Sequence, residues 1–178
     1  RLERDYPKSP NVKRAVLKRI DILRAIGRND EAIALMREVL SGQKNLYLNQ
    51  QQLTKMLKDL CQIYYGEGKF EEGMPYFDQL IARGITIEDK SLGAAASFEG
   101  LVEANSLDEA IKRLPLLAKE SSVRYLPRLN VALLKASDTM VEDERYTDAA
   151  LILNLIKTTD LMIEYNENKL AEKLVALD

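Results

Sequence analysis

A segment of six residues recurs four times along this chain of 178 residues, at almost even spacing. Each copy ends on a small residue, and the successive small residues lie 41, 37 and 39 positions apart. The four copies are Gly27-Arg28-Asn29-Asp30-Glu31-Ala32, Gly68-Lys69-Phe70-Glu71-Glu72-Gly73, Asn105-Ser106-Leu107-Asp108-Glu109-Ala110 and Glu144-Arg145-Tyr146-Thr147-Asp148-Ala149. Periods of roughly 20–50 residues indicate a repeat array in which each unit packs on its neighbours.

Large apolar residues flank each copy at fixed distances from its small residue. Four positions later stand Met36, Phe77, Leu114 and Leu153, and seven positions later stand Val39, Leu80, Leu117 and Ile156. Nine positions earlier stand Leu23, Tyr64, Leu101 and Met140. A small side chain lets the second helix of a hairpin approach the first closely, and the large side chains fill the face beside it. Each copy therefore predicts a turn between two helices.

The residues around the turns have helical spacing. Ser9 supplies a capping hydroxyl before Pro10 at the first helical position, and Val12, Val16, Ile20 and Leu23 follow on one helix face. Gly27 and Gly68 are expected to end first helices. No stretch alternates apolar and polar residues for long. The sequence therefore predicts an all-α fold.

We expect one domain over residues 1–178, an α-solenoid of antiparallel helix pairs with repeats at about 10–43, 47–84, 89–120 and 122–158. A terminal helix at about 160–177 is expected to cover the last repeat. Because the chain begins with Arg1 rather than Met, we expect a fragment of a longer protein. Pro115 lies about two turns into its helix and predicts a kink, and whether that kink acts as a hinge stays open.

The composition excludes several kinds of active site. The chain has no histidine and one cysteine, Cys61, so His-based triads, His or Cys₄ zinc sites and internal disulfides are ruled out. No GxxxxGK[ST] phosphate loop occurs. Carboxylate pairs such as Glu71-Glu72 lie near expected helix N-termini, where the dipole favours acids. A site made of carboxylates alone is the remaining enzymatic alternative, and Cys61 is expected to be a buried apolar residue. We expect no enzymatic activity, no cofactor and no metal.

The composition also bears on partners. Uninterrupted apolar runs are only a few residues long, so we expect no membrane span. The pI near 5.5 and the absence of an aromatic–basic RNA motif argue against nucleic acid. The expected partner is another protein, as a peptide or a helix.

Charge is distributed unevenly along the chain. Residues 1–28 carry nine Lys and Arg against three acidic residues, whereas residues 138–178 carry four against ten. On a helical wheel, one arc opposite the first apolar stripe is basic, and it is formed by Lys13, Arg14, Lys18, Arg24 and Arg28. Either this arc is a solvated helix face, or it is a docking strip for an acidic partner or for the acidic end of a second copy.

The repeats resemble the tetratricopeptide repeat over about residues 10–165. The closest copy is Gly68-Lys69-Phe70 with Gly73 and Phe77, which is similar to the family's turn, small residue and aromatic. The chain departs from the family in its longer spacing, in its early first-helix positions and in lacking the closing proline. Those early positions read Val16, Leu57, Ala94 and Leu133. A Sel1- or HEAT-like relative is the alternative.

The resemblance implies a right-handed superhelix whose first helices line a concave groove. It marks as groove candidates Tyr64, Tyr65, Arg124, Arg128 and Asn130, and Tyr and Arg are common in binding hot spots. The implied function is a non-enzymatic protein–protein interaction scaffold that binds a peptide or helix in this groove. The alternative is a structural or oligomerisation segment that stacks through its basic and acidic ends.

The opening segment bears on location. Residues 2–10 include Tyr6-Pro7-Lys8-Ser9-Pro10, which is similar to a YPxSP segment between repeats of bacterial envelope tetratricopeptide proteins. This similarity implies the periplasm or cell envelope, with the cytoplasm as the alternative. Cys61 is compatible with both.

Overall fold

The chain is all-helical wherever the structure describes it. The structure is a computed structural model that describes residues 9–44, 46–118 and 126–158, together with Val175, and no strand occurs among them. The helices are, in chain order, α2 (Pro10–Ala25), α3 (Asn29–Leu40), α4 (Gln50–Glu67), α5 (Phe70–Arg83), α6 (Ile87–Glu103), α7 (Leu107–Ile111), α8 (Leu114–Leu117), α9 (Leu126–Glu142) and α10 (Tyr146–Thr158). The all-α class predicted from the sequence is confirmed.

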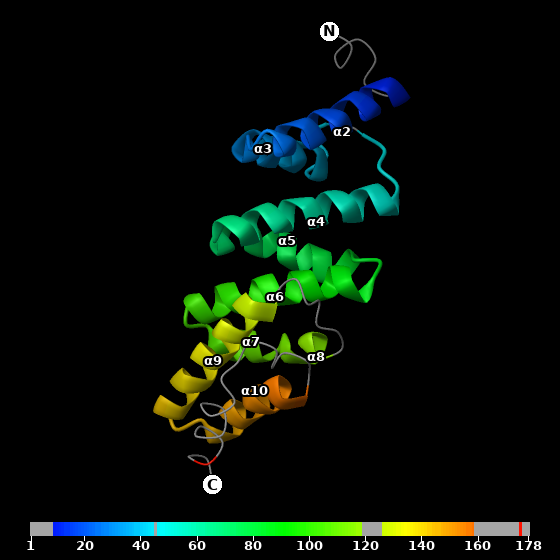
Figure 1. Ribbon diagram of the computed structural model, residues 1–178. Coiled ribbons are helices and arrows are strands. Elements are labelled where there is room, and N and C mark those ends of the chain that lie inside the picture. The colour runs from blue at the N-terminus through cyan, green and yellow to red at the C-terminus, as the bar shows by residue number, and fades with distance from the viewer. Residues whose placement is uncertain (1–8, 45, 119–125, 159–174, 176–178) are drawn as a thin grey trace.

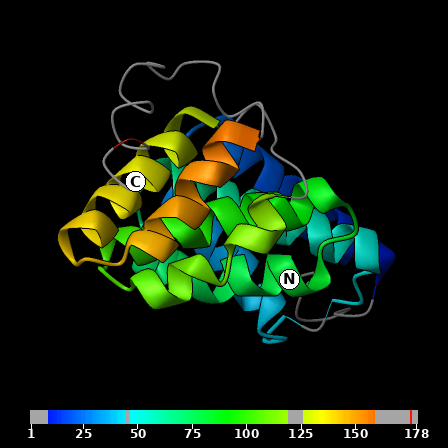
Figure 2. The same cartoon turned by 90° about the horizontal axis from the view of Figure 1, so that it is seen from below.

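The helices form pairs that follow one another from the N-terminal to the C-terminal end (Figure 1). Helix α2 packs on α3, α4 on α5 and α9 on α10, and α6 packs on α7 and α8. Successive pairs also touch, most extensively where α5 packs on α6. Viewed from below, α9 and α10 lie side by side at the near end and α2 lies behind the other helices (Figure 2). We call α2, α4, α6 and α9 the first helices.

The four recurrent segments share one backbone geometry. Their first residues all have positive φ, at 74° for Gly27, 68° for Gly68, 54° for Asn105 and 58° for Glu144. In each turn the next residue donates its N–H to the carbonyl five positions back, at 2.7–2.9 Å. These carbonyls belong to Leu23, Tyr64, Leu101 and Met140. This is the hydrogen bond of a helix that ends on a left-handed residue.

Replacing Glu144 with Gly is expected to stabilise the fold by about 1 kcal/mol, because a left-handed φ strains a residue that has a Cβ. Asn105→Gly should stabilise the fold less than Glu144→Gly does, because Asn tolerates a left-handed φ better than Glu. Urea denaturation followed by circular dichroism measures both effects. Gly68→Ala is the reverse control and should destabilise. A loss of stability in Glu144→Gly would contradict this account of the turn.

Local sequence sets the helix starts. The Ser9 side chain accepts a hydrogen bond from the Asn11 N–H, and Pro10 is the first residue of α2, as predicted. Asn49 and Thr86 each form a capping box at the start of α4 and α6. These caps satisfy N–H groups that have no partner inside the helix.

Pro115 coincides with a break in a helix. Instead of one kinked helix, the structure has α7 ending at Ile111 and α8 beginning at Leu114, with Pro115 in the first turn of α8. A proline has no N–H to donate and is best tolerated in a first turn, so the chain begins a new helix there.

Among the described residues, the buried side chains form two clusters, and α6 contributes to both. Its Leu92 and Ala96 pack with residues of α2 to α5, whereas its Ala94, Ala95 and Phe98 pack with residues of α7 to α10. The run of small residues at 93–97 in α6 thus serves close internal packing.

Some expectations fall outside the described residues. They are the terminal helix at about 160–177, the segment at residues 1–8 and the groove candidate Arg124.

Candidate protein-binding face

Ion pairs join each first helix to the next one. One pair at each junction has a largely buried carboxylate. These pairs are Arg24–Asp59 at 2.6 Å between α2 and α4, Lys58–Asp89 at 3.2 Å between α4 and α6, and Arg128–Glu99 at 2.7 Å between α9 and α6. The three carboxylates are largely buried, so solvent screens these pairs less than it screens surface pairs. The first helices therefore form one continuous face with polar links between its elements.

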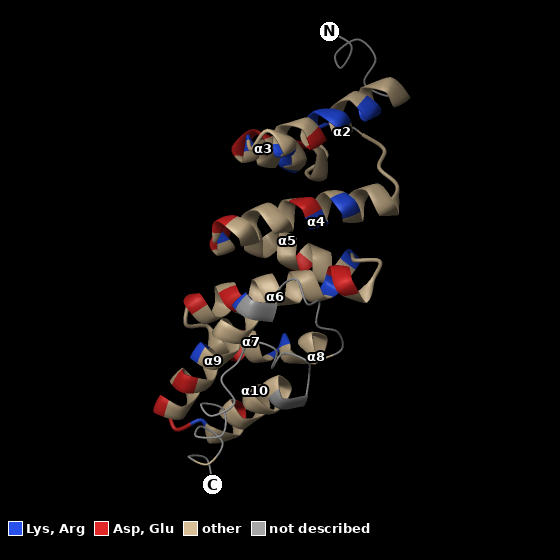
Figure 3. Ribbon diagram, in the orientation of Figure 1, with Lys and Arg blue, Asp and Glu red and all other residues tan. Residues whose placement is uncertain are grey.

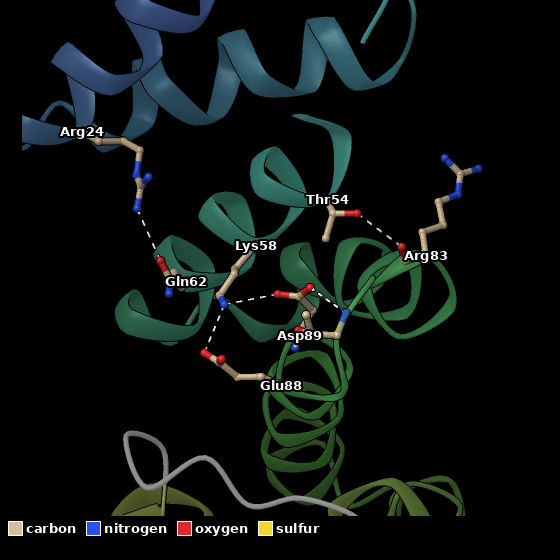
Figure 4. A network of polar contacts seen from close by, with 8 residues as sticks. Arg24, Thr54, Lys58, Gln62, Arg83, Glu88 and Asp89 are labelled. Carbon is tan, nitrogen blue, oxygen red and sulfur yellow. Dashed lines mark hydrogen bonds and ion pairs between the residues drawn. The ribbon is translucent and has the colours of Figure 1, made fainter. Parts of the chain in front are cut away.

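The link between α2 and α4 is a small network. Arg24 pairs with Asp59. It also reaches the Gln62 side-chain oxygen at 3.5 Å (Figure 4). Lys55 lies 3.2 Å from Asp21 of α2 and 3.0 Å from Asp59 of its own helix. Although burial opposes it, hydrogen bonding to Asp59 and Asp21 raises the pKa of Lys55, so the lysine stays charged.

A cleft of about 230 Å³ lies between α2 and α4 beside this network. Its apolar lining consists of Leu17, Ile20 and Met56, and its polar lining consists of Asp21, Gln52, Lys55 and Asp59. We call it the α2–α4 cleft. It combines an apolar surface with charges of both signs, which suits one apolar side chain flanked by polar backbone or charged groups.

The link between α4 and α6 is centred on Lys58. Its ammonium lies 3.1 Å from Glu88 and 3.2 Å from Asp89 at the start of α6 (Figure 4). Asp89 also accepts the Thr86 backbone N–H at 3.1 Å. Burial alone would raise the pKa of Asp89, but the hydrogen bonds from Thr86 and Lys58 outweigh it and hold that pKa below its usual value.

Replacing Asp89 with Asn is expected to cost about 1–2 kcal/mol at pH 7, because a capping carboxylate and a half-buried ion pair are lost together. The folded pKa is lowered, so this stability is present above the unfolded pKa near 4 and is lost as the pH falls through the folded pKa. The two proteins should therefore converge in stability at acid pH. Urea denaturation at a series of pH values measures the difference.

The matched control is Glu88→Gln, which removes the exposed carboxylate bound to the same lysine. It should cost less than about 0.5 kcal/mol. An equal cost for both variants, or a difference for Asp89→Asn that does not shrink as the pH falls, would show that Asp89 does not act through its charge.

Arg128 joins three elements at the other end of the face. Its guanidinium pairs with Glu99 of α6, donates to the Tyr65 carbonyl of α4 at 2.8 Å and lies 4.4 Å from the centre of the Tyr65 ring. Phe70 of α5 lies edge-on to that ring. The Arg128 side chain is still 43% exposed, so it holds the helices together and also faces solvent.

The structure buries three of the groove candidates. Tyr64 has no exposed surface and stacks on Tyr76, with ring centres 5.7 Å apart. Tyr65 is covered by Arg128, and Asn130 is buried in α9. Their side chains are thus part of the packing between helices, and of the described candidates only Arg128 presents an accessible side chain.

Two members of the predicted basic arc face α4 in the structure. Lys13 donates to the Tyr47 carbonyl and to Gln52, both at 3.3 Å, and Arg24 pairs with Asp59. Arg14, Lys18 and Arg28 are exposed, and Arg28 pairs with Glu31 in its own turn. The arc therefore divides into an internal side and an exposed side.

Sequence reasoning missed the acidic half of this face. Asp59 and Glu99 are buried within α4 and α6, whose buried residues are mostly apolar or small. A charged residue on the apolar side of a helix was the available signal, since buried carboxylates need partners.

Other chemistry is limited in the described part of the chain. Burial raises the pKa of the Cys61 thiol, so little reactive thiolate forms at neutral pH. Among the described residues, no group of three metal-ligating side chains comes together. None of the described helices has the length and apolarity needed to cross a bilayer. Comparisons with protein families, curated proteins and solved structures find no match.

Proposed function

We propose that the chain is an α-solenoid of the tetratricopeptide kind that acts as a non-enzymatic protein–protein interaction scaffold. The shared geometry of the four turns supports a repeat, and the ion pairs between successive first helices support a regular stack. Turns of adjacent pairs are also linked at equivalent positions, by Lys69–Asp30 at 3.2 Å and Arg145–Asp108 at 2.6 Å.

The α2–α4 cleft is the observation that carries the binding proposal. At about 230 Å³ it is smaller than the roughly 300–1,000 Å³ of typical small-molecule pockets. Its size fits one anchoring side chain of a longer ligand. Its apolar lining would take that side chain, while Lys55 and Asp21 are exposed at its edge and would contact the flanking residues. A peptide or helix with an apolar anchor is the ligand that meets both conditions.

Selection of a random peptide display library against the folded chain tests this proposal. Enriched sequences would be synthesised with a fluorescent label and titrated by anisotropy. Leu17→Glu and Lys55→Glu should each weaken binding by about tenfold or more, because one places a charge in the cleft and the other reverses its edge.

Val131→Glu is the matched control, because Val131 is an exposed apolar residue on another first helix. Circular dichroism would verify that every variant is folded. Failure to enrich any peptide, or equal binding by the wild type and both cleft variants, would refute the cleft as the binding site.

A further inference from the structure

Helix α2 carries an exposed apolar strip that the α2–α4 cleft does not include. Ala15 and Ile22 of α2 and the C-cap residue Ile26 form the strip, and we call it the outer face of α2. Ile22 is 49% exposed and Ile26 is 59% exposed. Large apolar side chains grouped on one helix face are typical of a surface that another element covers.

The outer face lies on the side of α2 turned away from α4. Residues nine apart in a helix differ by about 900°, which is half a turn beyond two full turns. Ile22 therefore lies opposite Lys13, and Ile26 lies opposite Leu17. Lys13 and Leu17 face α4, the first through its bond to Gln52 and the second through the cleft. In Figure 1, α2 lies at the N-terminal end of the stack with α4 on one side.

The repeat alignment identifies the matching surface of the other first helices. Ala15, Arg19 and Ile22 stand 17, 13 and 10 positions before the small residue Ala32. The same positions are Met56, Leu60 and Ile63 in α4, and Gly93, Ser97 and Gly100 in α6. All six of these residues are buried, whereas their counterparts in α2 are exposed. The outer face of α2 is thus the one copy among these three helices that the described residues leave uncovered.

In α4 and α6, the helices that bury the equivalent surface include the second helix of the preceding pair. On α6 it is α5, which lies so close that a Cβ on Gly93 would be 2.7 Å from the Phe77 carbonyl oxygen. On α4 it is α3, whose Asn29 donates to Glu67 at 2.8 Å. Glu67 holds the position of Ile26 in the alignment. The fold itself therefore shows which kind of element fits this surface.

Charge defines the occupant further. Helix α3 carries Asp30, Glu31 and Glu38 against Arg37 alone, and α5 has the same acidic excess. The outer face is flanked by basic side chains that are exposed, namely Arg14, Lys18 and Arg19. Figure 3 shows Lys and Arg on α2. Like charges oppose pairing of this face with the same face of a second copy, whereas an acidic helix complements it.

We propose that the outer face of α2 docks an acidic amphipathic helix, in the place that α3 takes on α4. The helix sets its apolar stripe on Ala15, Ile22 and Ile26, and its carboxylates pair with Arg19 and the neighbouring bases. This surface is separate from the α2–α4 cleft, so a scaffold that binds a peptide there presents a second docking site on the other side of α2.

A titration followed by ¹⁵N NMR tests the proposal with a defined probe. The probe is an N-acetylated, C-amidated peptide with the sequence of residues 29–40, and the control peptide has its three acids replaced by amides. We expect saturable shifts of the Ala15, Arg19 and Ile22 amides. The control peptide, which lacks the three acids, should bind several-fold more weakly than the probe, and added salt should weaken binding of the probe to a similar extent. The double variant Ile22→Glu/Ile26→Glu should bind the probe about tenfold more weakly or worse.

The control variant is Ile85→Glu, an exposed isoleucine outside α2, and it should bind like the wild type. No saturable shifts at millimolar peptide, shifts confined to the α2–α4 cleft, or unchanged binding by Ile22→Glu/Ile26→Glu would each overturn the proposal. Sedimentation of the chain without peptide tests whether a second copy of the chain covers the outer face instead. Self-association that disappears in Ile22→Glu/Ile26→Glu would assign the outer face to a second copy and likewise overturn it.

Discussion

Replacing Tyr64 with Ala is expected to destabilise the fold by about 3–5 kcal/mol, the range found when a large aromatic side chain is removed from a core. Tyr64 is fully buried in α4, and its ring stacks on Tyr76 of α5. Its Cβ would lie 2.9 Å from a Cβ placed on Gly73, where the two helices come closest. Removing the side chain therefore opens a cavity at a helix contact. Urea denaturation followed by circular dichroism measures the loss.

The comparison that decides the role of Tyr64 uses a second tyrosine. Tyr47 is 72% exposed, so Tyr47→Ala should change stability by less than about 0.5 kcal/mol. If Tyr64→Ala kept the stability of the wild type and abolished peptide binding instead, Tyr64 would be a ligand contact and the packing account would be wrong.

Replacing Gly93 with Val is expected to cost about 3 kcal/mol, because α5 leaves no room for a side chain there. An added Cβ would meet the Phe77 carbonyl oxygen at 2.7 Å and the Ile81 Cγ1 at 3.0 Å. The nearest obstacle is backbone, so relief requires that α5 and α6 move apart. Thermal and urea denaturation both report this loss, and we expect the variant to remain helical but less stable.

A second helical glycine supplies the matched control. Gly66 lies in α4 with no atom within 4 Å of an added Cβ. Gly66→Ala should therefore stabilise the fold by up to about 1 kcal/mol through helix propensity alone. A stabilising Gly93→Ala of the same size would mean that the contact between α5 and α6 is looser than described.

The helix-turn pattern was predictable because it depends on local rules. Each of its signals depends on a few neighbouring residues. These signals are the four spaced turns, the capping serine before Pro10 and the glycines at helix ends. The positive φ of Asn105 and Glu144 follows from alignment with Gly27 and Gly68 rather than from their own preferences. A repeat thus extends local prediction to positions whose residue type gives no signal.

The candidate site was less predictable because it depends on which side of each first helix is covered. A helix with its own partner on one side and neighbouring pairs on two others buries most of its surface. In α4 this burial reaches both Tyr64 and Tyr65, which residue type alone marks as binding residues. Burial decides between the two roles, and a helical wheel does not show how many neighbours a helix has.

Long-range ion pairs were the other feature that could not be predicted from the sequence. Arg24 and Asp59 belong to different repeats, as do Arg128 and Glu99. Their pairing depends on how two helices are placed against each other, and no local spacing encodes that. This is why a basic arc that looks uniform on α2 has Lys13 and Arg24 turned toward α4 in the folded chain.

The double membership of α6 limits how this molecule could be divided. If the chain were cut before α6, the N-terminal fragment would lose Leu92 and Ala96 from its core. If it were cut after α6, the C-terminal fragment would lose Ala94, Ala95 and Phe98. Neither fragment would keep a complete interior. A helix that packs on both sides cannot be lost without exposing both clusters, so insertion or deletion of a helix should be tolerated least at α6.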